Sequence, residues 1–102
     1  MKRIIDGKRY DTDTAEMICD VSSRINDQRD FKWHDTQLYR TKKGAWFVAG
    51  EGGPMSRWAH DTGDGYGYGS GLVVIEADEA RELLEQHDEL DALAEYFNVE
   101  DA

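Results

Sequence analysis

The chain has 102 residues, with 12 Lys and Arg against 22 Asp and Glu, which gives a formal net charge of -10 at pH 7. This length predicts one compact domain over residues 1–102 and excludes separate catalytic and cofactor domains. The shortage of basic residues argues against direct binding of DNA or RNA, because Lys and Arg are needed to neutralise phosphates. No apolar run approaches the roughly 20 residues of a membrane span, and the opening MKRIIDG lacks the apolar stretch of a signal peptide, so we expect a cytoplasmic protein.

The first part of the chain is predicted to form two strands and a helix. Residues 3–10 contain the pair Asp6-Gly7, which is the strongest two-residue signal for a hairpin turn. Threonines then supply N-cap side chains for a helix over residues 15–23 with one apolar side. The lone Cys19 has no partner for an internal disulfide, and we expect it to be a small buried residue.

The middle of the chain is the clearest β region. Residues 36–41 and 45–49 flank a Lys-Lys-Gly turn and predict an antiparallel hairpin. The stretch 50–54 is expected to end this hairpin, because glycine weakens a strand and proline removes a ladder donor. Residues 55–59 are expected to form one helical turn. The expected packing residues of the hairpin are Leu38, Tyr39, Trp46, Phe47 and Val48.

Glycine occupies every second position in the segment GDGYGYGSG, residues 63–71. Glycine has no side chain to pack and tolerates many backbone angles, so this segment predicts a mobile surface loop or a floppy hairpin tip. The short apolar run over residues 72–75 predicts a central strand.

The C-terminus is predicted to be helical. Apolar residues recur every three or four positions from Ala80 to Phe97 behind an N-cap at Asp78, and a break near His87-Asp88 would divide the segment into two helices. The element order predicts an α+β domain, with a small antiparallel sheet of about four to five strands packed with an N-terminal helix and one or two C-terminal helices.

The excess negative charge lies after Arg57. Up to that residue the chain has 11 bases and 9 acids, whereas the rest has 13 acids and only Arg81 as a base. Four glutamates on the last helix are spaced by three or four residues, which predicts a row along one exposed edge: Glu79, Glu82, Glu85 and Glu89. This row is either a solvated face or a docking surface for Lys and Arg, and a row of carboxylates can imitate a phosphate backbone, as in DNA mimicry.

A second candidate contact surface lies in and before the glycine-rich segment. Tyrosine and tryptophan provide contact area at little entropic cost, so Trp58, Tyr66 and Tyr68 predict an exposed aromatic patch, with the charges of Asp61 and Asp64 nearby. The alternative is that these rings fold back over the core.

The chain shows no motif for a metal, a cofactor or a catalytic group. The histidines His34, His60 and His87 have no His or Cys partner at ligand spacing, and the glycine segments lack nucleotide-binding motifs. Ser56 and Ser70 lie in no nucleophile-elbow context. We therefore expect a protein that is not an enzyme and uses no cofactor.

Three segments together resemble a family of small acidic proteins from bacterial prophages and mobile elements: IIDGKRYDTDTAEMI, LYRTKKGAWFVAGEGGPMSRWA and LVVIEADEARELLEQ. The resemblance covers most of the chain. Such accessory proteins include phage-encoded anti-CRISPR inhibitors, so the resemblance implies a role of that kind in a bacterial host cell.

These observations leave three hypotheses open. In the first, an anti-CRISPR-like inhibitor uses its acidic helix and adjacent aromatics to occupy the basic nucleic-acid channel of a CRISPR effector complex. In the second, the inhibitor docks through its β-hairpin and the GEGGP turn over residues 50–54, and its acidity only improves solubility. In the third, a small structural or regulatory protein of a mobile element acts as a homodimer through an exposed sheet edge. A monomer and a homodimer are both compatible with the sequence, and no membrane partner is expected.

Overall fold

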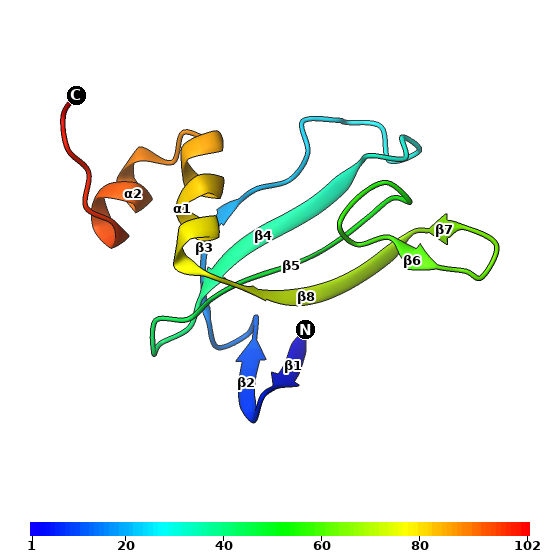
Figure 1. Cartoon of the computed structure of the whole chain (residues 1–102), viewed down its shortest axis with the longest axis horizontal. Coiled ribbons are helices and arrows are strands. Elements are labelled where there is room, and N and C mark those ends of the chain that lie inside the picture. Colours follow the sequence, from blue (N-terminus) through cyan, green and yellow to red (C-terminus); the bar gives the residue numbers. More distant parts are fainter.

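Eight short strands precede two helices in the computed structural model, which describes residues 1–102 (Figure 1). The strands are β1 (Lys2–Ile5), β2 (Lys8–Asp11), β3 (Glu16–Asp20), β4 (His34–Arg40), β5 (Trp46–Gly52), β6 (His60–Asp61), β7 (Tyr66–Gly67) and β8 (Gly69–Ile75). The helices are α1 (Ala77–Gln86) and α2 (Leu90–Tyr96). Four strands form the main antiparallel sheet in the order β3-β4-β5-β8, and β1–β2 and β6–β7 are separate hairpins. The predicted α+β class with an antiparallel sheet is therefore confirmed.

The β1–β2 hairpin turns where the sequence predicts it. Asp6 and Gly7 have φ angles of 52° and 76°, and both values lie in the left-handed region that a type I′ turn requires.

The second predicted hairpin, β4–β5, also exists but is longer than expected. The two strands pair from Arg40 opposite Trp46 to His34 opposite Gly52, so β5 continues past the predicted end at residue 50. A Cβ atom on Gly50 would collide with the backbone of β4. Glycine here allows close backbone packing, and the strand continues through it.

The predicted N-terminal helix over residues 15–23 is wrong, because this segment contains strand β3, which pairs with β4. The register shifts between Met17 and Cys19, as in a β-bulge. As a result, the consecutive residues Ile18 and Cys19 both pack against the core beneath the helices. This adjacent apolar pair imitates part of a helical repeat, and pairing with β4 overrides the local N-cap signal.

Strand β5 is the centre of the fold and is buried on both faces. Trp46 and Val48 belong to the core beneath α1 and α2, whereas Phe47 and Ala49 belong to a second cluster that includes Tyr10 from the β1–β2 hairpin. Of the expected packing residues of the hairpin, only Tyr39 is half-buried rather than buried; it stacks on Phe47 with ring centroids 5.0 Å apart. The expected burial of Cys19 is confirmed.

The last strand, β8, begins inside the glycine-rich segment and forms an edge of the main sheet, so the predicted central position of residues 72–75 is wrong. Trp58 lies against the glycines of β8. A Cβ on Gly71 would lie 3.3 Å from the Trp58 ring, and a Cβ on Gly69 would collide with the Trp58 carbonyl oxygen. Residues 55–59 form turns and not the expected helical turn.

The C-terminal segment breaks into two helices near His87 and Asp88, one of the two predicted outcomes. Asp88 has a φ of 53°, a left-handed conformation that ends α1. The predicted N-cap at Asp78 is wrong: Glu76 occupies that position, and Asp78 lies in the first turn, where its charge favours the helix dipole. Neither helix combines the length and the apolar character needed to cross a membrane.

Candidate functional site

The outer side of α1 carries three carboxylates in line. Asp78, Glu82 and Glu85 stand at positions i, i+4 and i+7, so they lie on one side of the helix, away from the buried Ala80 and Leu84. We call these three exposed residues the acidic stripe. Within it, the Arg81 guanidinium lies 4.0 Å from Glu85, while Asp78 and Glu82 have no ion-pair partner.

Two of the four predicted glutamates lie outside the acidic stripe. The Glu79 carboxylate accepts a hydrogen bond from Arg57 at 3.0 Å, which ties the start of α1 to the loop before β6. Glu89 is the N-cap residue of α2, so the row on α1 ends before it. Burial and then the negative charge of Glu89 raise the pKa of the Cys19 thiol to about 11, which keeps this thiol protonated.

The structure divides the predicted aromatic patch. Trp58 is 5% exposed and belongs to the core, so its predicted exposure is wrong. Tyr66 and Tyr68 are exposed and lie near β7, at the end of the molecule away from the helices (Figure 1). Asp61 and Asp64 are exposed in the same β6–β7 segment. Four of the five candidates are therefore accessible, but they are separated from the acidic stripe.

A chain of hydrogen bonds connects three side chains beneath the helices. The indole Nε1–H of Trp58 donates to Thr36 Oγ1 at 2.8 Å, and Thr36 Oγ1 lies 2.8 Å from Nδ1 of His34. The direction of this second bond depends on the tautomer: when the threonine hydroxyl donates, Nδ1 is unprotonated and the ring carries its proton on Nε2.

The surroundings of His34 favour its neutral form. Burial is the largest cause of its lowered pKa, and the positive charges of Arg57 and His87 lower it further from the usual 6.5. The carboxylates of Asp20 and Asp35 act in the opposite direction without reversing the shift. His34 is therefore a neutral hydrogen-bond donor at neutral pH.

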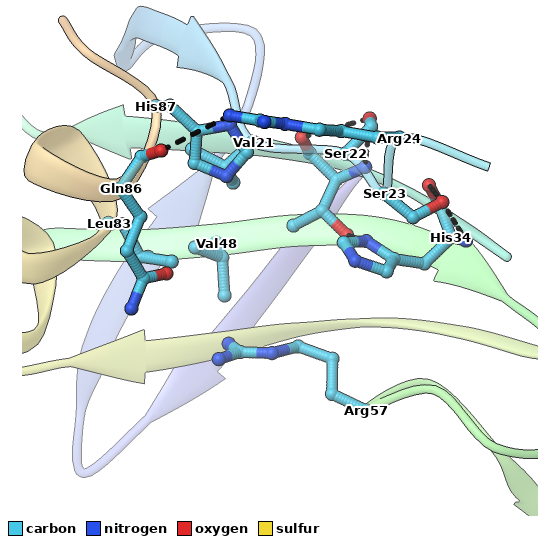
Figure 2. Close-up of a pocket in the computed structure, with 11 residues that line it drawn as sticks. Val21, Ser22, Ser23, Arg24, His34, Val48, Arg57, Leu83, Gln86 and His87 are labelled. Carbon is cyan, nitrogen blue, oxygen red and sulfur yellow. Dashed lines mark hydrogen bonds between the residues drawn. The ribbon is translucent and has the colours of Figure 1, made fainter. Parts of the chain in front are cut away.

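A hollow of about 270 Å³ opens beside this network, between β4, the segment after β3 and the C-terminal end of α1 (Figure 2). We call it the basic hollow, because no Asp or Glu side chain lines it although the chain has 22 of them. Its polar lining consists of Ser22, Ser23, Arg24, His34, Thr36, Arg57, Gln86 and His87, and its apolar lining of Val21, Val48 and Leu83.

The two serines in the basic hollow are engaged in hydrogen bonds that do not involve a histidine ring. The hydroxyl of Ser22 donates to the carboxylate of Asp35 at 2.9 Å, and that of Ser23 donates to the backbone carbonyl of His34 at 3.2 Å. No hydrogen bond joins either hydroxyl to a histidine ring, so the geometry does not activate a serine nucleophile. Nowhere in the chain do three His, Cys, Asp or Glu side chains gather closely enough to hold a metal ion.

Sequence reasoning missed the basic hollow because its arginine and histidine side chains are far apart in the chain. Arg24 follows β3, His34 begins β4, Arg57 lies before β6 and His87 caps α1. Only the pairing of β3 with β4 and the packing of α1 bring them together. No local signal in the sequence groups these residues.

Comparison of the chain with protein-family models, with curated proteins and with solved structures gave no match.

Proposed function

We propose that this protein is a non-enzymatic inhibitor of the anti-CRISPR kind, carried by a phage or mobile element, which docks its acidic stripe in the basic nucleic-acid channel of a host defence nucleoprotein complex. One observation carries the proposal: Asp78 and Glu82 are exposed without a cation partner on a helix whose other side is committed to the core. The resemblance of the chain to small phage proteins supplies the class of partner.

The charge density of the acidic stripe supports this mode of binding. An α-helix rises about 1.5 Å per residue, so Asp78 and Glu85 are separated by about 10 Å along α1, with Glu82 between them. One strand of B-DNA presents about one phosphate per 3.4 Å of helix axis, or about three over the same length. A channel lined with Lys and Arg for phosphates therefore meets a similar line of carboxylates, of which only Glu85 is partly offset by Arg81.

The surroundings extend the negative field beyond the stripe. Asp91 and Glu95 are exposed on α2 and have no ion-pair partner, whereas Glu79 is compensated by Arg57. Such a one-signed surface steers a basic partner towards it over distances near the Debye length, about 10 Å at 0.1 M salt. We expect fast association that slows steeply as salt is added.

The β6–β7 segment provides a second, smaller contact. Its exposed Tyr66 and Tyr68 lie at the opposite end of the molecule from the helices (Figure 1). The longest dimension of the molecule is 47 Å. A partner that touches both ends must extend along the whole length of the sheet. A large nucleoprotein complex is big enough to do so. Asp61 and Asp64 add negative charge to this second contact.

Two matched double variants test the docking mode. Asp78→Asn with Glu82→Gln removes two charges from the acidic stripe, and Asp13→Asn with Glu51→Gln removes two from exposed, unpaired positions elsewhere. Each protein is expressed in bacteria with an active CRISPR system, and the plating efficiency of a targeted phage is measured.

We expect the unaltered protein and the control variant to restore phage plating and the stripe variant to lose this effect. With the captured effector complex, double-stranded target DNA should compete for binding. Equal activity of the two variants would exclude the acidic stripe as the docking surface, and failure of the unaltered protein against every CRISPR type tested would exclude the inhibitor function.

A homodimeric structural or regulatory protein is the alternative, because β8 is an edge strand with the exposed apolar residue Val73. Against it, the Arg3 guanidinium donates to the Leu72 carbonyl at 2.9 Å, which places a cation beside this edge. Sedimentation velocity separates the two cases: a dimer weakened by Val73→Lys supports the alternative, and a monomer at all concentrations excludes it.

A further inference from the structure

Cationic and hydrogen-bonding side chains surround the basic hollow from different directions. Figure 2 shows the side chains of Arg24 and Arg57 on two sides of it, with the His34 ring between them and the end of α1, including His87, on a third side. An anion bound in the hollow would be attracted by both guanidinium groups.

Most donors around the hollow have no partner within the protein. Arg24 uses one nitrogen on the Gln86 carbonyl at 3.4 Å, and Arg57 uses one on the carboxylate of Glu79. Because arginine has five N–H donors, each keeps several for a ligand. The Nε2 of His34 has no hydrogen-bond partner in the structure, since only its Nδ1 is engaged.

The carboxylates near this hollow all accept hydrogen bonds, two of them from Ser22 in its lining and the third, that of Glu79, from Arg57. Asp35 accepts hydrogen bonds from Ser22 at 2.9 Å and from Gln37 at 2.7 Å. Asp20 accepts one from the backbone N–H of Ser22 at 2.7 Å. Neither carboxylate lines the hollow. An anion entering it would therefore meet the free donors of Arg24 and Arg57 in the lining, while these carboxylates lie behind it.

We propose that the basic hollow binds a phosphate group, either as inorganic phosphate or as a phosphate monoester. Guanidinium and imidazole donors that converge from several directions suit the oxygens of a tetrahedral anion. The volume of about 270 Å³ is several times the share of about 30 Å³ that one water molecule takes in the liquid. It leaves room for part of the carrier molecule against Val48 and Leu83. This inference does not rest on the proposed function.

The first test is a titration of the unaltered protein with inorganic phosphate, followed by NMR of the His34 ring, with NaCl added to keep the ionic strength constant. We expect a saturable shift of the ring signals and a rise of the His34 pKa, because a bound anion stabilises the imidazolium form. A shift that NaCl alone reproduces, or no saturable shift, overturns the proposal.

Arginine variants give the second test by calorimetry. Arg24→Gln and Arg57→Gln should each weaken phosphate binding about tenfold or more, because each removes a charge-assisted hydrogen bond. Arg29→Gln makes the same change of charge on a side chain that is 91% exposed and lies outside the hollow. The affinity of this variant for phosphate should equal that of the unaltered protein. Equal weakening in all three variants would mean general charge screening and would overturn the site.

Two further variants make the test independent of folding defects and of docking. Glu79→Gln frees Arg57 and should strengthen phosphate binding even if Arg24→Gln proves unstable by circular dichroism. The Asp78→Asn, Glu82→Gln variant should keep phosphate binding, whether or not it loses the partner. Loss of phosphate binding in both variants would contradict the site, while the phage-plating result would be unaffected.

The source of the phosphate group is distinguished by comparing inorganic phosphate, adenosine monophosphate and adenosine as probes. Tighter binding of the monophosphate than of inorganic phosphate supports a monoester ligand, and equal binding of the two supports inorganic phosphate. Binding of adenosine as tight as that of its monophosphate would show that the phosphate is not recognised and would overturn the proposal.

Discussion

The indole nitrogen of Trp58 donates a hydrogen bond of 2.8 Å to the hydroxyl of Thr36, and both residues are buried. This bond attaches the loop between β5 and β6 to strand β4, which carries Thr36 and pairs with β5 in the main sheet. The loop also carries Arg57, so the same bond positions one side of the basic hollow.

The first prediction concerns this hydrogen bond. Thr36→Val keeps the shape of the side chain but leaves the Trp58 N–H unpaired in the core, which should lower the free energy of unfolding by about 1–3 kcal/mol. Thr14→Val, at an exposed position, should change it by less than about 0.5 kcal/mol. Urea unfolding measures both, and the Trp58 indole proton should exchange faster in Thr36→Val. Similar stabilities for the two variants would show that the bond contributes little.

The second prediction separates two glycines of the same repeat. Gly69→Ala places a Cβ against the Trp58 carbonyl, which is backbone and cannot rotate away, so we expect a loss of about 1–3 kcal/mol in unfolding free energy. Gly67→Ala meets only the methyl group of Thr62 at 3.3 Å, a side chain that can adjust, so its loss should stay near 0.5 kcal/mol or less. The midpoints of urea unfolding decide the matter; a larger loss for Gly67→Ala would contradict this packing.

The third prediction is a pH dependence that originates at His34. Its pKa is lowered in the folded protein, chiefly by burial and also by Arg57 and His87, so between that value and 6.5 the unfolded chain binds more protons than the folded one. The contribution of His34 to stability is therefore fully present above pH 6.5 and is lost as the pH falls through the lowered value.

Unfolding at a series of pH values from 5 to 8 measures this contribution. His34→Asn retains an acceptor for the threonine proton and removes the titrating ring, so its stability should fall less on acidification than that of the unaltered protein. His60→Asn makes the same substitution at an exposed position outside the hydrogen-bonded network and is the matched control. The assignment to His34 fails if both variants have the same profile.

Features encoded within a few residues were predictable from the sequence. The Asp6-Gly7 hairpin depends on two residues that tolerate a positive φ, and both have one. The apolar run around Phe47 indicates burial, and β5 is buried on both faces. The division of the C-terminal helix also had a local signal, because Asp is one of the few residue types that tolerate a left-handed conformation. Asp88 has this conformation at the break.

Features encoded by pairing between distant segments were not predictable. Strand β3 has a helix-like apolar pattern because of its bulge, and only its partner β4 determines that it is a strand. Tryptophan is a residue type that often forms exposed contacts, so the sequence suggested exposure for Trp58. In the fold, the glycines of β8 leave a surface without side chains against which Trp58 is buried. The arginine and histidine side chains of the basic hollow share no local motif, and only the folded chain brings them together.

The contact between Gly71 and the Trp58 ring restricts how this sequence can diverge in evolution. A Cβ at position 71 would lie 3.3 Å from the indole ring, so alanine there requires the ring, which is buried, to shift by a few tenths of an ångström. The two positions should consequently be inherited as a pair. The glycine-rich segment therefore has two unlike parts: in β8 a Cβ at position 69 would collide with the backbone of Trp58, whereas in β7 a Cβ at position 67 would meet only the methyl group of Thr62.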